Sequence, residues 1–192
     1  MQNRVAKIQL GISKEICFGR RMSYDYDKLY ASTPDALGAP TQIFVDFFAD
    51  HISTNVCVLD VGCGQGRDAV FIARLGHRVV GVDYAPSGIR DLNATAKKEG
   101  LSIQGVVADI TDYDPNDAFD VVLIDRTLHM LDEGPRLAAL KTLAGCVAPH
   151  GWLLIADESS NIPAFIRVLD AMDTDWQTHL HKRGTLFMKR TD

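Results

Sequence analysis

Short apolar runs alternate with helical patterns from Val56 onward. Nearly continuous apolar runs are typical of parallel strands that are buried on both faces. We expect strands at Val56–Val61, His77–Asp83, Ser102–Ile110, Phe119–Asp125 and Trp152–Asp157. Helices are expected at Arg67–Leu75, Ser87–Glu99, Pro135–Val147 and Ile162–Met172. Gly76, Gly100 and Pro149 follow three of these helices, as residues that end helices do. The alternation predicts a doubly wound α/β sheet.

Both ends of the chain depart from this alternation. Near the C-terminus, WQTHLH and TLFMKR flank KRG, a short glycine-containing connection that predicts an antiparallel hairpin. The fold class expected is therefore a mostly parallel, Rossmann-like sheet of seven strands that ends in this hairpin. Near the N-terminus, Pro40–Ile52 carries apolar residues on one helical face and predicts a capping helix.

The first residues, MQNRVAKIQLGISKEICFGRR, have mixed polarity and suggest a loose or vector-derived arm. No repeat or linker divides the 192 residues, so we predict a single domain at 1–192. Within it, residues 1–52 form an N-terminal arm and cap, and residues 53–192 form the core.

Composition narrows the classes of partner and of location. The net charge is -5, and no large Lys/Arg cluster occurs, which disfavours nucleic acid and membrane as partners. The cysteines form no close pair, so reduced thiols are expected at Cys17, Cys57, Cys63 and Cys146. No apolar run approaches the roughly 18 residues of a membrane span, and no signal-peptide core occurs. We therefore expect a cytoplasmic protein, either a monomer or a homodimer.

The stretch VLDVGCGQGRDAVF, at 58–71, places Gly62, Gly64 and Gly66 between a strand and a helix. Such a loop lies at the carboxyl edge of the sheet, where open α/β folds bind ligands. A phosphate-binding P-loop would need a Gly-Lys-Ser/Thr sequence, which this loop lacks. The dinucleotide pattern G-x-G-x-x-G fails as well, because its third glycine would fall at Arg67.

Aspartates end three successive predicted strands: Asp83, Asp109 and Asp125. Any one of them alone is more often a turn or helix-cap residue. Together, beside one glycine loop, they favour a shared site for a cationic or amine-rich nucleoside, and they disfavour a pyrophosphate.

The segments VLDVGCGQGRDAVFIARLGHRVVGVDYAPSGI, VVADI and FDVVLIDRTLHML resemble the class I S-adenosylmethionine-dependent methyltransferases. The first segment is most similar to the branch that includes tellurite-resistance and thiopurine methyltransferases. The resemblance implies that 53–192 is a cofactor-binding core, that S-adenosyl-L-methionine is the cofactor, and that a small molecule accepts the methyl group by in-line displacement.

The resemblance also implies roles for individual residues. The methionine part of the cofactor would lie against Asp60, Gly62, Cys63, Gly64, Asp125 and Arg126. Asp83 would hold the ribose hydroxyls, and the adenine would contact Tyr84, Asp109 and Ile110. Arg67 would either reach the cofactor carboxylate or cover the loop.

Catalytic candidates are His129, Asp125 and Tyr30. His129 would act as a general base if the acceptor is protonated, or it would pack as a helix-face residue. Tyr26 and Tyr30 lie one helical turn apart, so they would face the cofactor and acceptor together or pack the cap on the sheet.

Other functions remain open at this level. A metal-dependent catechol-type O-methyltransferase would use Asp125 and Asp157, although Glu158 stands where that group usually has asparagine; the main interpretation involves no metal. The Pro-Pro-Tyr/Phe motif of enzymes that methylate bases or glutamine is absent, since IDRT occupies that position. A non-catalytic S-adenosylmethionine-binding regulatory protein, and a nucleotide-sugar or NAD-linked enzyme, are further alternatives.

Overall fold

Seven strands form one sheet in the order β3-β2-β1-β4-β5-β7-β6. The computed structural model describes residues 24–52, 55–115 and 117–192, so the predicted arm through Arg21, with Cys17, lies outside the described residues. The strands are β1 (Cys57–Val61), β2 (Arg78–Asp83), β3 (Ile103–Val107), β4 (Phe119–Asp125), β5 (Val147–Ala156), β6 (Trp176–Lys182) and β7 (Thr185–Arg190). The predicted fold class is confirmed.

Strands β1 to β5 are parallel, and β7 pairs antiparallel with both β5 and β6. The predicted hairpin turns at Arg183 and Gly184, where Arg183 has a φ of +54°. The Gly184 carbonyl accepts a hydrogen bond from the Asp157 N–H at 2.8 Å. The hairpin therefore fixes the chain just after β5, at the carboxyl edge of the sheet.

Two strand boundaries differ from the prediction by three residues or more, for physical reasons. Strand β5 begins at Val147 instead of Trp152, because Val147 pairs with Phe119 across a register shift. That shift accommodates Pro149, which has no N–H for the ladder. Strand β3 ends at Val107 instead of Ile110, because the chain then turns around Asp109.

The helices are α1 (Tyr26–Ser32), α2 (Gln42–His51), α3 (Arg67–Arg74), α4 (Pro86–Glu99), α5 (Glu133–Gly145) and α6 (Ile162–Asp170), with the short 3₁₀ helix η1 (Leu128–Met130). Neither α1 nor η1 was expected as a helix of its own. Helix α5 begins two residues before Pro135, because the first helical turn needs no N–H donors. In the described residues, no helix is long and apolar enough to cross a membrane.

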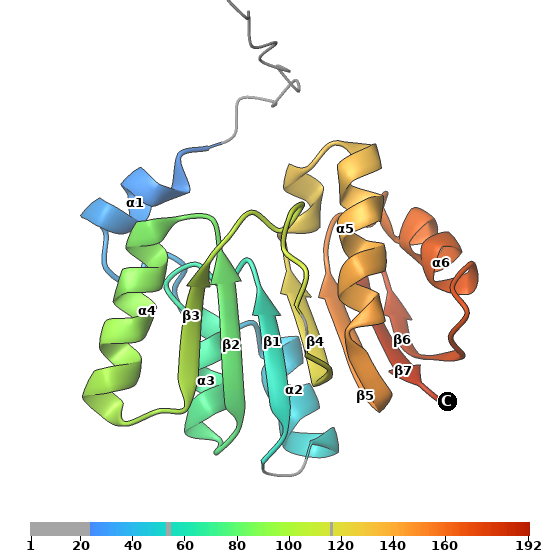
Figure 1. Cartoon of the computed structure of the whole chain (residues 1–192), viewed down its shortest axis with the longest axis horizontal. Helices are drawn as coiled ribbons and strands as arrows, with labels where there is room; N and C mark the ends of the chain where they lie inside the picture. The colour runs from blue at the N-terminus through green and yellow to red at the C-terminus, as the bar shows by residue number, and fades with distance from the viewer. Residues whose placement is uncertain (1–23, 53–54, 116) are drawn as a thin grey trace, which may run out of the picture.

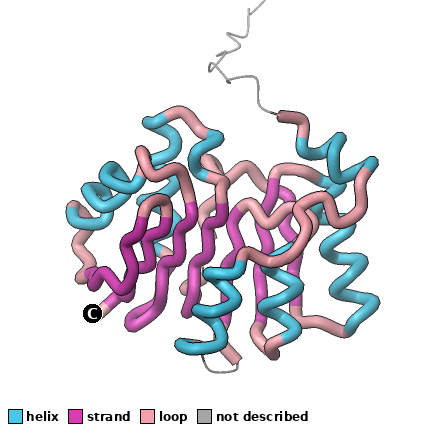
Figure 2. Tube along the Cα trace, turned by 180° about the vertical axis from the view of Figure 1, so that it is seen from behind, coloured by secondary structure: helices cyan, strands magenta, loops and turns pink. Residues whose placement is uncertain are grey.

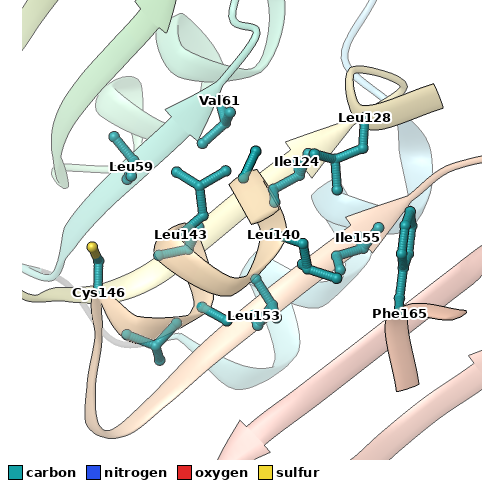
Figure 3. Close-up of a cluster of buried hydrophobic side chains, with 14 of the residues drawn as sticks. Leu59, Val61, Ile124, Leu128, Leu140, Leu143, Cys146, Leu153, Ile155 and Phe165 are labelled. Carbon is teal, nitrogen blue, oxygen red and sulfur yellow. The ribbon is translucent and has the colours of Figure 1, made fainter. Parts of the chain in front are cut away.

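Helices cover both faces of the sheet. Helices α5 and α6 lie on the face seen in Figure 1, and α2 and α3 lie on the face seen in Figure 2. Figure 3 shows the core under α5 and α6, where Leu140 and Leu143 pack against Leu59, Ile124 and Leu153 of three strands. The cap helix α2 buries Phe44, Phe47 and Phe48 on the other face, as its apolar pattern predicts.

The carboxyl ends of the parallel strands point upward in Figure 1, and α1 lies above them beside the start of α4. The glycine loop after β1 and the turn after β4 meet at the same edge. Thr127 Oγ1 donates to the Val61 carbonyl at 3.0 Å, and a Cβ on Gly62 would overlap the Thr127 side chain. The fold therefore brings the loop and the η1 turn into direct contact.

Candidate functional site

The glycine loop turns the chain sharply between β1 and α3. Gly62, Gly64 and Gly66 have φ angles of +74°, +54° and +89°, a backbone region that residues with a Cβ rarely adopt. The N–H groups of Gly62 and Cys63 donate to the Val82 carbonyl at 2.7 and 3.1 Å. The loop is thus bonded to β2, and it lies at the carboxyl edge, as its place between a strand and a helix predicts.

Asp83 ends β2 directly beside this loop. One carboxylate oxygen accepts from the Gly64 N–H at 2.9 Å, and the other accepts from the Ala85 N–H at 2.8 Å. Burial raises the pKa of Asp83, and these hydrogen bonds oppose the rise. A carboxylate oxygen can accept more than one hydrogen bond, so the ribose role of Asp83 stays a prediction.

Asp109 and Asp83 have different surroundings. Asp109 lies two residues beyond β3, and its Oδ1 accepts from the N–H and hydroxyl of Thr111 at 3.0 and 2.8 Å. This is the turn role that a single strand-end aspartate often has. Ile110, next to it, is buried. Adenine recognition by Asp109 and Ile110 remains a prediction.

Three buried carboxylates lie near one arginine beside the loop: Asp60, Asp68 and Asp125. Arg67 donates from Nε and Nη2 to Asp68 Oδ2 at 3.0 and 2.8 Å, and Nη2 also contacts Asp125. Thr41 adds two bonds from the segment before α2: its hydroxyl donates to Asp125 at 2.7 Å and its N–H to Asp68 at 3.1 Å. Arg67 is therefore bound by carboxylates of the protein, and its predicted part in cofactor binding stays a prediction.

The cluster contains acceptor atoms with no partner among the described residues. Asp60 Oδ2 and Asp125 Oδ1 are buried there without a hydrogen bond. Burial raises the pKa of Asp60, and the charges of Asp68 and Asp125 raise it further. Buried polar atoms without partners are costly. The cluster therefore favours a ligand that brings a hydrogen-bond donor or a positive group.

The tyrosine-rich segment covers the glycine loop. Tyr26 and Tyr30 have ring centroids 5.8 Å apart, as their spacing predicts. Tyr30 is only 5% exposed, and its ring lies between two glycines: an added Cβ would approach it to 2.6 Å from Gly64 and to 2.9 Å from Gly88. The ring thus packs the cap against the glycine loop, whereas the contacts of Tyr26 and Tyr30 with cofactor and acceptor stay predictions.

The environment of Tyr30 narrows its chemical role. Burial raises the pKa of the Tyr30 phenol, and the Asp83 carboxylate raises it further. The phenol therefore stays protonated near neutral pH and can donate a hydrogen bond. This favours a positioning role for Tyr30 over the role of a base.

Hydrogen bonds hold this cover in place from both sides. The Gln65 side chain accepts from the Ala36 N–H at 2.9 Å and donates to the Thr33 carbonyl at 3.1 Å. The Asp27 carboxylate accepts from the Ser87 N–H at the start of α4, at 2.7 Å. Segment 24–36 is therefore connected to the glycine loop and to α4.

His129, on η1, faces Asp157, which follows β5. His129 Nδ1 is 3.7 Å from Asp157 Oδ2, and the same oxygen accepts from the His129 backbone N–H at 3.0 Å. Asn161 Nδ2 donates to the other oxygen of Asp157 at 2.7 Å. The Asp157 side chain is fully buried, whereas 29% of the His129 side chain is exposed. A buried carboxylate thus orients a partly accessible imidazole.

This pairing shifts both titrations. The Asp157 carboxylate raises the pKa of His129, although partial burial opposes it. Burial alone would raise the pKa of Asp157, but the nearby His129 ring and the hydrogen bonds from Asn161 Nδ2 and the Glu158 N–H lower it overall. Because Nδ1 faces Asp157, Nε2 is the nitrogen left to receive a proton from an acceptor.

The structure gives Asp157 a role that the sequence analysis did not. It was considered only as a metal ligand together with Asp125, but the two carboxylates bind different partners: Arg67 and Thr41 for Asp125, and His129 and Asn161 for Asp157. In the described part of the chain, no three His, Cys, Asp or Glu side chains are grouped to hold a metal. The two carboxylates therefore have separate protein partners, and the catechol-type alternative stays untested.

The remaining predicted site residues lie around the same edge. Arg126 follows β4 with a φ of +49°, and it is exposed. Tyr84 is 44% exposed, and its hydroxyl donates to the Tyr24 carbonyl at 3.4 Å. Cys63 is buried, and burial raises the pKa of its thiol. Their contacts with a cofactor stay predictions.

Sequence reasoning missed Thr41, Gln65, Asp68 and Asn161 as parts of this site. Asp68 could have been found, because it adjoins Arg67 in the first turn of a helix. Thr41 and Gln65 join segments that are far apart in the chain, and no periodicity or motif signals such contacts.

Comparisons with known proteins agree with this arrangement. Residues 58–151 match the family described as "Methyltransferase domain". Ubiquinone biosynthesis O-methyltransferase of Bradyrhizobium diazoefficiens is 33% identical over 109 residues, which are 56% of this chain and 42% of that protein. The chain thus spans less than half the length of this curated relative.

Solved structures show the same fold. TehB from Haemophilus influenzae superposes with a TM-score of 0.65 at 20% identity, over 87% of this chain and 66% of that one. N-methyltransferase NodS from Bradyrhizobium japonicum, in complex with S-adenosylhomocysteine, gives a TM-score of 0.65 at 17% identity, over 88% and 97% of the two chains. The predicted cofactor, S-adenosylmethionine, is confirmed at the level of the family. The glycine loop, the sheet and the matched domain together show that residues 58–151 form a domain of the methyltransferase family, of the class I S-adenosylmethionine-dependent type that the sequence resembles.

Proposed function

We propose that this chain is an enzyme that transfers a methyl group from S-adenosylmethionine to a small-molecule acceptor by in-line displacement. The observation that carries the proposal is the meeting of two elements at one sheet edge. The glycine loop, with its buried carboxylates, contacts the η1 turn through Thr127, and that turn carries His129 with its partner Asp157. A cofactor-binding element and a candidate base therefore adjoin each other.

The residues at the edge suit this cofactor. When bound, S-adenosylmethionine supplies an electrophilic methyl group on a positively charged sulfur. Asp60 and Asp125 offer unpartnered carboxylate oxygens for positive groups, and Asp83 offers acceptor capacity for ribose hydroxyls. Gly62 and Gly64 let the backbone itself form the wall of the site. The proposal also includes the predicted cofactor contacts of five further residues: Tyr26, Tyr84, Asp109, Ile110 and Arg126.

Most of the rate of such a displacement comes from positioning, which can contribute roughly 7–11 kcal/mol. Tyr30, buried against Gly64, would shield that part of the loop from water. His129 would remove a proton at Nε2 from an acceptor hydroxyl or ammonium, and its raised pKa strengthens it as a base. The relatives named above include an O-methyltransferase and an N-methyltransferase, both of which act on acceptor atoms that can carry a proton.

We also infer that residues 1–192 act as one methyltransferase domain, with the cap at 1–52 and the cofactor-binding core at 53–192. The net charge of -5 supports a small acceptor over nucleic acid. A cytoplasmic location and a monomeric or homodimeric state complete the proposal.

Titration calorimetry tests the cofactor assignment. S-adenosylhomocysteine should bind in the micromolar range or tighter, at about -8 kcal/mol, and NAD should not bind. Tight NAD binding without a response to S-adenosylhomocysteine would refute the assignment. A panel of phenols, amines, thiols and carboxylates then tests turnover; binding without any turnover would favour a regulatory protein instead.

The His129→Gln variant tests the base. We expect about 10²–10⁴-fold slower turnover with unchanged affinity for S-adenosylhomocysteine. His181→Gln, at an exposed position on β6, is the matched control and should retain full activity. Equal activity of the two variants would remove His129 from the mechanism.

A further inference from the structure

A pocket of about 420 Å³ opens between the first turns of α5 and α6, apart from the glycine loop. Its polar wall consists of Glu133, Arg136, Ser160, Asn161 and Arg167, and its apolar wall includes Leu137 and Phe165. This volume lies within the range of small-molecule pockets. Of these residues only Asn161 has a role described above, as the partner of Asp157.

The charges of the pocket favour an anion. Arg136 and Arg167 carry two positive charges, and Glu133 carries one negative charge. Arg167 is exposed at the surface, whereas Arg136 is half-buried. Arginine is suited to carboxylates because its planar fork donates two parallel hydrogen bonds.

Arg136 is held in position by the protein and still has free donors. Its Nε and Nη2 donate to the Leu131 carbonyl at 3.2 and 2.8 Å, and its Nη1 contacts Asn161 Oδ1. Guanidinium has five N–H donors. One N–H on each terminal nitrogen is therefore without a partner among the described residues.

The same pocket wall is connected to the candidate base. Asn161 contacts Arg136 through Oδ1 and donates to Asp157 through Nδ2 at 2.7 Å. Asp157 in turn accepts from the His129 backbone and lies 3.7 Å from its ring. A group bound by Arg136 would therefore lie close to the residues that orient His129.

We propose that this pocket binds a carboxylate of the methyl acceptor, with Arg136 and Arg167 as its ligands. The inference rests on the proposed function, and it names the class of acceptor: a molecule with a carboxylate at one end and a hydroxyl or amine at the other. Leu137 of α5 would contact the apolar body between these two groups. Asn161 is a positioning residue that links the anchored carboxylate to the base.

A binding experiment tests the pocket without any turnover. Benzoate is added to protein labelled with ¹⁵N-arginine, and the Nε signals are followed by NMR. The signals of Arg136 and Arg167 should shift saturably, and that of Arg90, exposed on α4, should not. Benzamide should produce no saturable shift, and neither should sodium chloride at the ionic strength of the benzoate samples. In Arg167→Gln, benzoate should bind at least about tenfold more weakly, and in Arg90→Gln as in the wild type.

The absence of a saturable benzoate shift, or an equal shift with benzamide, would overturn the inference.

The activity arm compares 4-hydroxyphenylacetate with its amide. Preference for the carboxylate in kcat/KM should fall about tenfold in Arg167→Gln, and S-adenosylhomocysteine affinity should not change. Failure to bind S-adenosylhomocysteine would refute the proposed function but not the pocket, because benzoate binding separately tests whether the pocket takes a carboxylate.

Discussion

Gly64→Ala is the sharpest test of how the cap meets the glycine loop. A Cβ at this position would lie 2.6 Å from the Tyr30 hydroxyl and 2.9 Å from both Tyr30 Cζ and Leu37 Cδ1. The φ of Gly64 is also positive, at +54°. The substitution therefore combines backbone strain with a collision.

Gly100→Ala separates these two effects. Gly100 has a similar φ of +66°, but no atom lies within 4 Å of its added Cβ. An alanine in the left-handed region costs roughly 1–2 kcal/mol, and a less flexible unfolded chain offsets about 0.4–1 kcal/mol of this. Overpacking adds about 1–3 kcal/mol at Gly64 only. We expect Gly100→Ala to cost about 1 kcal/mol and Gly64→Ala roughly 2–4 kcal/mol.

Urea unfolding of both variants measures these free energies, in the wild type and in a Tyr30→Leu background. If the collision is with the tyrosine ring, the excess cost of Gly64→Ala should shrink by about 1 kcal/mol or more in that background. The cost of Gly100→Ala should stay the same. Equal costs of the two alanines in both backgrounds would refute the packing of Tyr30 on the loop.

Three further predictions concern titrating groups. His129 has a raised pKa, so its stabilising contribution is complete below about pH 6.5 and is lost as pH rises through the folded-state pKa. Asp157→Asn should therefore destabilise more at about pH 5.5 than at about pH 9 in urea unfolding; the reverse order would contradict the ion pair. Asp83→Asn should weaken S-adenosylhomocysteine binding at least about tenfold, since charge-assisted bonds contribute about 1.5–3 kcal/mol each; unchanged calorimetric affinity in a folded variant would place the ribose elsewhere. Burial raises the pKa of the Cys63 thiol, so iodoacetamide should modify Cys63 far more slowly in the native protein than in urea, and equal rates by mass spectrometry would show that the loop is open.

The apolar periodicity predicted the sheet well, because a strand that is buried on both faces has an apolar run in its own sequence. Strand β4 lies where its apolar run places it, at Phe119–Asp125, and the hairpin follows from a glycine-containing connection. Boundaries were missed where a long-range contact decides them. Strand β5 starts at Val147 because this residue pairs with β4 across an irregular register. The sequence did not reveal this start, because Pro149 is not expected inside a strand.

The candidate site likewise has one part that local sequence predicts and one part that only long-range contacts decide. The glycine loop is a local motif, since a sharp turn needs positive φ within a few residues. The partners of its charged residues come from elsewhere: Asp125 is bound by Thr41, which is 84 positions away in sequence. The pairing of His129 with Asp157 also spans two strand ends. Patterns in a single sequence do not indicate which residues far apart in the chain come into contact.

The division has a consequence for specificity. The proposed cofactor side is built from the backbone of the loop and from buried carboxylates, where a substitution disturbs the fold as well as binding. The proposed acceptor side is built from side chains on the first turns of α5 and α6, and Arg167 is exposed there. Changing Arg167 leaves the sheet and the loop untouched, because α6 is anchored by other residues, such as Phe165 and Leu169 in the core. Acceptor preference can therefore change through one or two side chains of α5 and α6 while cofactor binding is retained, which is why the arginine variant and the S-adenosylhomocysteine titration measure separate properties of this protein.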